Sequence, residues 1–294
     1  MRFDGNRAWQ QAIRLFSANK ELLLILAGVF FFLPGLASAF FLTDVQVQMV
    51  HDIGTIDPRD SKAMLTAVGG LYARIGPYVA LLTIAQVAGT MAMMALLTDS
   101  ARPTVGEAIR VGLSRLPTVL GVMLLLMLGY LLAALAFGLV LGLLAMVAGV
   151  AGGGSSAVMM AVVAVGMGGF MAFIIVAMTR LSVTLPVIVI EQVRGPLRAL
   201  KRSWWLTKGN TGSLLGFYLV LMVAYAVIAM LLYMVLTALV ALGTQQGSRA
   251  FYMASGVISG LIGGVVSVLA TCIISAVHGQ LAGPGRETIV ETFR

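Results

Sequence analysis

The chain has 294 residues, 60% of them hydrophobic and only 10% charged, with a formal net charge of +8 at pH 7. This composition excludes a soluble domain, because a folded chain of this size cannot hide so much apolar surface from water. The basic residues lie in short segments between apolar runs, which excludes the basic polar face that nucleic-acid binding requires. Cys272 is the only cysteine, so one chain can form neither a disulfide framework nor a cysteine-based metal site.

Six apolar runs are long enough to cross a bilayer. A hydrocarbon core of about 30 Å needs roughly 20 residues of helix. The sequence therefore predicts an all-α, polytopic membrane protein in which residues 1–294 form a single membrane domain. The six predicted transmembrane helices cover residues 22–43, 77–98, 118–148, 158–179, 213–242 and 252–278.

The positions of the basic residues indicate the orientation of the chain. Cytoplasmic segments retain Lys and Arg, and 15 of the 19 such residues fall in four segments: 1–21, 99–117, 180–212 and 279–294. Both termini are therefore predicted to be cytoplasmic. The segment 44–76 is then the one sizeable outward-facing loop.

Each cytoplasmic segment that precedes a pair of spans has the pattern of a short amphipathic helix. In the second segment, Thr104 and Glu107 have the spacing of a capping box, and in the third, Gly209 is placed to end the helix. Such helices lie in the membrane interface with their basic residues near anionic headgroups. We expect the following residues to contact lipid headgroups or a partner: Arg14, Arg110, Arg115, Arg198, Lys201, Arg202, Trp204, Trp205 and Lys208.

The three amphipathic segments also suggest an internal repeat. Ala12-Ile13-Arg14, Ala108-Ile109-Arg110 and Ala199-Leu200-Lys201 recur at spacings of 96 and 91 residues. The recurrence predicts three repeat units, 1–98, 99–190 and 191–294, each an interfacial amphipathic helix followed by a helical hairpin. Alternatively, selection for positive residues on the inside places a basic helix before every second span.

Three segments, 102–110, 185–191 and 195–209, resemble the membrane domain found beside some bacterial glycerophosphodiester phosphodiesterases. The same pattern is similar to a wider set of uncharacterised bacterial inner-membrane proteins with six spans. Its most specific part is Ser203-Trp204-Trp205-Leu206-Thr207-Lys208-Gly209. The resemblance implies a multi-pass protein of the bacterial inner membrane. It implies no reaction, because hydrolysis in the fused proteins belongs to a separate soluble barrel domain.

Polar residues within the spans are costly in lipid and are candidates for function. A span that ends near residue 179 leaves Arg180 at the inner surface, whereas a span that begins near 168 buries it on the same helix face as Glu191. Gln86, in the second span, can hydrogen-bond a neighbouring helix. Ser267 and Thr271 belong to a row of hydroxyl residues in the last span, which either joins helices or lines a polar path.

The last span is also rich in glycine. Gly256, Gly260 and Gly264 allow close backbone approach, which predicts a helix at the centre of the bundle or in the seam of a homo-oligomer. His278, near the inner end of this span, is expected to satisfy end carbonyls. His51, among spaced Asp residues of the outward loop, is typical of solvated surface, so we expect no metal and no cofactor.

No catalytic motif is recognisable. The sequence predicts a non-enzymatic inner-membrane protein that organises or senses the membrane, or docks a soluble partner, at the cytoplasmic leaflet. Its expected partners are membrane lipids with anionic headgroups, and nucleic acid is not expected. The alternatives are a transporter or channel for a lipid or amphiphile, and the membrane subunit of a hydrolase that acts in trans. A cavity lined by Ser267, Thr271, Arg180 or Gln86 would favour transport.

Overall fold

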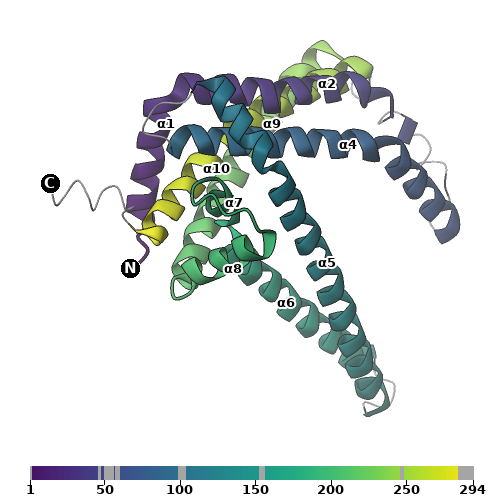
Figure 1. Cartoon of the computed structure of the whole chain (residues 1–294). Helices are drawn as coiled ribbons and strands as arrows, with labels where there is room; N and C mark the ends of the chain where they lie inside the picture. Colours follow the sequence, from purple (N-terminus) through teal and green to yellow (C-terminus); the bar gives the residue numbers. More distant parts are fainter. Residues whose placement is uncertain are drawn as a thin grey trace. The chain divides into compact units, whose positions relative to one another are not determined.

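The structure is a computed structural model that describes residues 2–45, 48, 49, 56, 60–98, 104–151, 156–245 and 248–283. Every regular element within these ranges is a helix (Figure 1). Six helical segments are long and apolar enough to cross a membrane: Gly5–Phe41, Ser61–Leu97, Val105–Val150, Ala157–Val189, Thr211–Gly243 and Arg249–Ala282. The predicted all-α class and the number of six spans are therefore confirmed by length and composition. The prediction that residues 44–76 form a loop was wrong for residues 61–76, because the second of these helices already begins at Ser61.

The first span contains one π-helical turn. It consists of α1 (Gly5–Ala27), the π turn η1 (Gly28–Phe32) and α2 (Leu33–Phe41). Pro34 follows the turn and has no N–H, so one backbone hydrogen bond of the regular ladder is missing there. The other helices are α4 (Ser61–Thr98), α5 (Val105–Ala151), α6 (Ser156–Leu181), α7 (Thr184–Val189), α8 (Pro196–Thr207), α9 (Thr211–Gly243) and α10 (Arg249–Ala282).

Only one of the three predicted short helices is a separate element. The first two continue without a break into their spans, within α1 and α5, whereas α8 stands alone. The difference lies at Gly209, whose φ of +91° is rarely adopted by other residues and ends the α8 segment. The capping box at the start of α5 is confirmed. The Thr104 N–H donates to Glu107 Oε2 at 2.8 Å, and the Glu107 N–H donates to Thr104 Oγ1 at 3.3 Å.

The chain forms two compact units, and several helices pass from one unit to the other. The first unit comprises residues 1–5, 117–218 and 277–294, and the second comprises residues 6–116 and 219–276. Each unit has its own packing and is described separately. The three-repeat organisation stays a prediction.

The core of the second unit lies between α1, α4 and α10. Leu23 and Leu26 of α1 are fully buried with Met93 of α4 and Val268 of α10. Small residues bring the backbones together around this core. A Cβ added at Gly112 would lie only 2.8 Å from the Ala88 carbonyl oxygen, so α4 and the start of α5 are in close contact.

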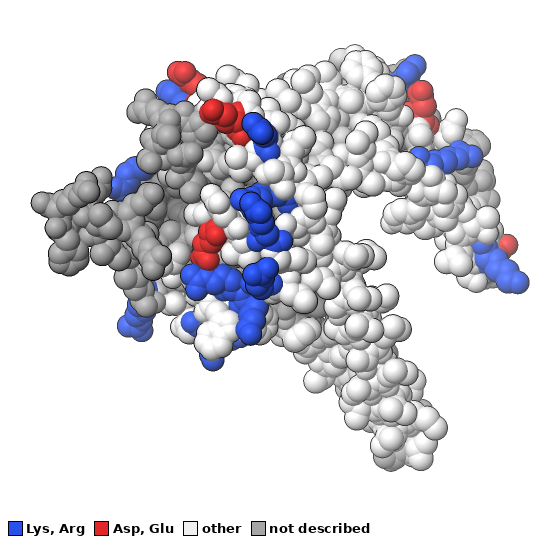
Figure 2. Space-filling view, viewed as in Figure 1, with Lys and Arg blue, Asp and Glu red and all other residues white. Residues whose placement is uncertain are grey.

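In the first unit, α5 and α6 form an apolar hairpin. The Phe137 and Phe170 rings stack with their centroids 4.5 Å apart, and a Cβ added at Gly166 would lie 2.5 Å from Leu141 Cδ1. No Lys, Arg, Asp or Glu occurs between Arg115 and Arg180. The hairpin is accordingly white in the space-filling view of Figure 2. The charged residues of α5 and α6 therefore lie only near the helix ends that are far from the turn joining the two helices.

Candidate functional site

Helix α8 of the first unit packs against the end of α6 through a face of small residues. Ala199, Ser203 and Thr207, spaced four residues apart, are all buried. The last carbonyls of a helix lack partners within that helix. Ser203 Oγ donates to the Arg180 carbonyl oxygen at 2.9 Å, and Thr207 Oγ1 lies 3.1 Å from the same oxygen. The hydroxyls of α8 thus satisfy the end of α6 and hold α8 in place.

The side chain of Arg180 lies between α8 and the start of α9. Its guanidinium carbon is 4.5 Å from the centroid of the Trp204 ring, and its Nε donates to Thr211 Oγ1 at 3.2 Å. No acidic group pairs with Arg180 among the described residues. A guanidinium that stacks on an aromatic ring keeps its edge available for an anion. Because α6 ends at Leu181, Arg180 and Glu191 do not share one continuous helix.

Glu191 joins two distant parts of the first unit. Its Oε2 accepts a hydrogen bond from Arg202 Nε at 2.8 Å, and its Oε1 lies 3.1 Å from His278 Nε2. Burial acts to raise the pKa of Glu191, but the hydrogen bonds and charges of Arg202 and His278 outweigh it and hold the pKa below 4.5. The prediction that His278 satisfies end carbonyls was wrong, since this nearly buried ring contacts a carboxylate.

The opposite face of α8 is exposed and combines tryptophan with lysine. The exposed fraction is 68% for Leu197 and 58% for Trp205, and Lys201 and Lys208 are exposed as well. Lys208 Nζ lies 4.8 Å from the centroid of the Trp205 ring. Figure 2 shows basic side chains gathered over α8. Tryptophan and lysine on one face are typical of a helix at a lipid headgroup boundary.

The structure brings together only some of the predicted headgroup residues. Arg198 is exposed on α8, and the charge of Arg202 is partly neutralised by Glu191. Arg14 and Arg110 are exposed in the second unit and are not part of this cluster. Arg115, also in the second unit, is half-buried, and its Nε has no hydrogen-bond partner in the described part of the chain.

The two ends of the described chain meet in the first unit. The Asp4 N–H donates to Gln280 Oε1 at 3.3 Å, and Gln280 Nε2 donates to the Asp4 carbonyl oxygen at 3.2 Å. In addition, the Phe3 N–H donates to Asn210 Oδ1 at 2.9 Å. The N-terminal residues therefore lie beside the end of α10 and the start of α9. That this side is cytoplasmic stays a prediction.

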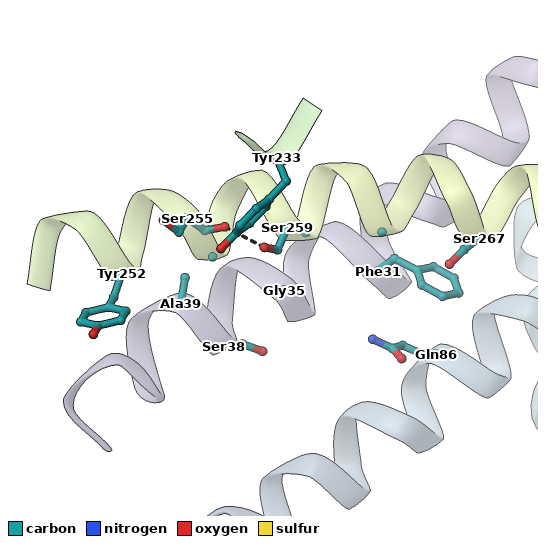
Figure 3. Close-up of a pocket in the computed structure, with 13 residues that line it drawn as sticks. Phe31, Gly35, Ser38, Ala39, Gln86, Tyr233, Tyr252, Ser255, Ser259 and Ser267 are labelled. Carbon is teal, nitrogen blue, oxygen red and sulfur yellow. Dashed lines mark hydrogen bonds between the residues drawn. The ribbon is translucent and has the colours of Figure 1, made fainter. Parts of the chain in front are cut away.

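A cavity of about 600 Å³ lies within the second unit (Figure 3). Its walls come from α2, α4, α9 and α10 and from the π turn, which contributes Phe31. Gln86 and Ser267, two of the polar residues singled out from the sequence, line it, whereas Thr271 is buried and donates to the Ser267 carbonyl oxygen. The complete lining is Phe31, Gly35, Ser38, Ala39, Gln86, Tyr233, Tyr252, Ser255, Gly256, Ser259, Gly260, Gly263 and Ser267.

Glycines set the closest approach beside this cavity. A Cβ added at Gly35 of α2 would lie 2.9 Å from Gly260 Cα, and one added at Gly256 would lie 2.6 Å from Ala39 Cβ. At Gly264 the nearest atoms are 3.9 Å away, which is an ordinary contact. Helices α2 and α10 thus touch along Gly256 and Gly260, and Gly264 is less crowded.

Some expected features fall outside the described residues. His51, Asp52 and Asp57 of the predicted outward loop belong to these. Within the ranges that the structure describes, no group of three His, Cys, Asp or Glu side chains could hold a metal ion.

Within the described residues, the fold is that of a helical protein with six helices long and apolar enough to cross a membrane, and it has two candidate sites of different chemistry, one charged and one neutral. Residues 7–282 match the model of a family described as a domain of unknown function, DUF7847, and the chain belongs to this family. No curated protein and no solved structure matches the chain.

Proposed function

We propose that this is a non-enzymatic protein of the bacterial inner membrane that binds anionic lipid headgroups at the cytoplasmic leaflet through α8, and so organises or senses that leaflet. The observation that carries the proposal is the arrangement of α8. Its small residues are used against α6, while Trp204, Trp205, Lys201 and Lys208 are left exposed. Each basic residue near an anionic surface contributes on the order of 1 kcal/mol to binding.

Arg180 gives the surface a more specific element. Its side chain is fixed by the Trp204 ring and by Thr211, and it has no acidic partner in the described part of the chain. Lipid phosphate supplies the charge and the acceptor oxygens that such a guanidinium lacks. We therefore assign Arg180 to phosphate binding and the exposed lysines to general attraction toward the anionic surface.

The test compares lipid selectivity in bilayers of mixed composition. The chain carrying Arg198→Gln, Lys201→Gln and Lys208→Gln is reconstituted with spin-labelled phosphatidylglycerol or spin-labelled phosphatidylcholine. The control carries Lys62→Gln, Arg74→Gln and Arg249→Gln, the same loss of formal charge at exposed residues on the predicted outward side; of these, Arg249 forms an exposed ion pair with Asp44 at 3.3 Å. Arg202 is left intact because Glu191 already binds it.

We expect the first variant to lose at least tenfold in preference for phosphatidylglycerol, since three charges of about 1 kcal/mol each exceed the 1.4 kcal/mol of one decade. The control should keep the preference of the unmodified chain. Equal preference in both variants and the unmodified chain would contradict the assignment to α8.

A further inference from the structure

The cavity of the second unit has an uncharged but strongly hydrogen-bonding wall. Seven of its lining residues are serine, tyrosine or glutamine, and none is charged. In Figure 3, Gln86 and Ser38 lie across the space from the serines of α10, and Tyr233 of α9 reaches toward Ser259. Phenol, hydroxyl and carboxamide groups both donate and accept hydrogen bonds, so the wall matches groups with the same property.

Hydroxyl residues in a helix can satisfy themselves by bonding to a carbonyl one turn earlier. Ser259 does so with the Ser255 carbonyl oxygen at 2.9 Å, and Ser38 does so with the Pro34 carbonyl oxygen at 2.9 Å. Such residues need no further partner. They make a wall polar without indicating that anything binds there.

Other polar groups of the wall have no hydrogen-bond partner among the described residues. These include the carboxamide of Gln86, the hydroxyls of Tyr233 and Tyr252, and Ser267 Oγ. Ser255 Oγ is buried and likewise has none. In a membrane an unpaired polar group costs several kcal/mol, so their gathering at one cavity indicates a hydrogen-bonding occupant.

The cavity is also partly open rather than enclosed. The exposed fraction of Tyr233 is 47%, and Gln86 and Ser259 are exposed too. A volume of about 600 Å³ is within the range of small-molecule sites. The π turn η1 places Phe31 in the wall, and π turns are frequent at functional sites.

From these observations we infer that the cavity binds the uncharged, hydroxyl-rich headgroup of an amphiphile, such as a glycolipid, whose acyl chains lie in the surrounding lipid. Ionised headgroups fit poorly because the wall offers no countercharge. The aromatic rings of Phe31, Tyr233 and Tyr252 suit the apolar faces of a sugar ring, while the polar groups bind its hydroxyls. This site shares no residue with α8. If the protein transports an amphiphile, the amphiphile must first bind in such a cavity.

The experiment uses photoactivatable lipids in phosphatidylcholine vesicles that contain the full chain. The probes are a diazirine-bearing monoglucosyl diacylglycerol, the same diacylglycerol without the sugar, and the corresponding phosphatidylglycerol. Labelled peptides are mapped by mass spectrometry. The glucosyl probe should label the 252–267 segment of α10 at least fivefold more than either of the other probes.

The variant carrying Tyr233→Phe and Gln86→Leu removes two of the unpaired groups and keeps the shape of the wall. It should lose about tenfold in labelling, because each neutral hydrogen bond contributes a few-fold. The control is Tyr225→Phe on the same helix, since Tyr225 has the same exposed fraction of 47% but does not line the cavity. A Tm in detergent equal to that of the unmodified chain shows that each variant is folded.

Equal labelling by the sugar-free probe, or labelling that the double variant leaves unchanged, would overturn the proposal. Displacement of the glucosyl probe by methyl glucoside in the aqueous phase would overturn the assignment to a lipid and identify a soluble sugar instead.

Discussion

Replacing Glu191 with Gln tests whether the contact between the 190–196 turn and the end of α10 stabilises the first unit. The carboxylate binds Arg202 through two hydrogen bonds, at 2.8 and 3.3 Å, and it also contacts His278 at 3.1 Å. Gln keeps the shape of the side chain and one acceptor oxygen. It removes the negative charge, so Arg202 and His278 lose the partner they share.

The magnitude follows from burial. Hydrogen bonds to charged groups contribute about 1.5–3 kcal/mol when buried, and exposed ion pairs contribute about 0.2–1 kcal/mol. Glu191 is 22% exposed, whereas Arg202 is 47% exposed, so this contact lies between the two cases. We expect Glu191→Gln to lower the free energy of unfolding by about 1–2 kcal/mol. For a chain of this length that corresponds to a fall in Tm of about 2–8 °C.

The pH dependence has a definite sign. The pKa of Glu191 is lower in the folded protein than its ordinary value of 4.5. Its contribution to stability is therefore fully present above pH 4.5 and is lost as the pH falls through the folded pKa. The difference in Tm between the unmodified chain and Glu191→Gln should shrink below pH 4.5.

The assay is thermal unfolding of the purified protein in detergent at several pH values. Glu21→Gln is the matched control, because Glu21 is exposed and makes no ion pair or hydrogen bond that the structure records. A Tm for Glu191→Gln equal to that of the control at pH 7 would refute the reasoning. So would a difference that persists undiminished at pH 3.

Two further predictions concern packing. Gly256→Ala should lower the free energy of unfolding by about 1–3 kcal/mol, because the added Cβ would lie 2.6 Å from Ala39 Cβ. Gly264→Ala on the same helix should change the Tm little, and equal Tm values for the two variants would contradict the close contact of α2 and α10. Ser203→Ala should lower the free energy of unfolding by about 1 kcal/mol, because the Arg180 carbonyl oxygen loses one hydrogen-bond donor. Thermal unfolding tests this against the exposed control Ser213→Ala, and equal Tm values would contradict the role of α8 in satisfying the end of α6.

Features encoded locally could be predicted from the sequence. The six spans follow from runs of apolar residues, and the capping box at Thr104 and the helix end at Gly209 follow from residue types at fixed spacing. The continuity of α1 and α5 could not be anticipated in this way. In α5 the amphipathic and apolar segments form one helix even though Pro117, which has no N–H for the backbone ladder, lies at their junction.

Contacts between distant residues could not be predicted. His278 lies 87 residues from Glu191, and neither has a neighbour in sequence that points to the other. The buried face of α8 was also missed, because Ala199, Ser203 and Thr207 are too small and polar to stand out as an apolar stripe. Gln86 and Ser267 were identified as unusual polar residues, but Tyr233 and Tyr252 were not, since tyrosine is common near the ends of spans.

The chemistry of the two sites argues for two separate ligands. The exposed face of α8 and Arg180 offer positive charge, and we propose that they bind phosphate at a surface where salt screens the interaction. The cavity is lined by no charged residue, and we propose that its unpaired hydroxyl and amide groups bind a neutral headgroup. Raising the salt concentration should therefore weaken the preference of α8 for phosphatidylglycerol, whereas binding in the cavity should not respond, because neutral hydrogen bonds release no counterions.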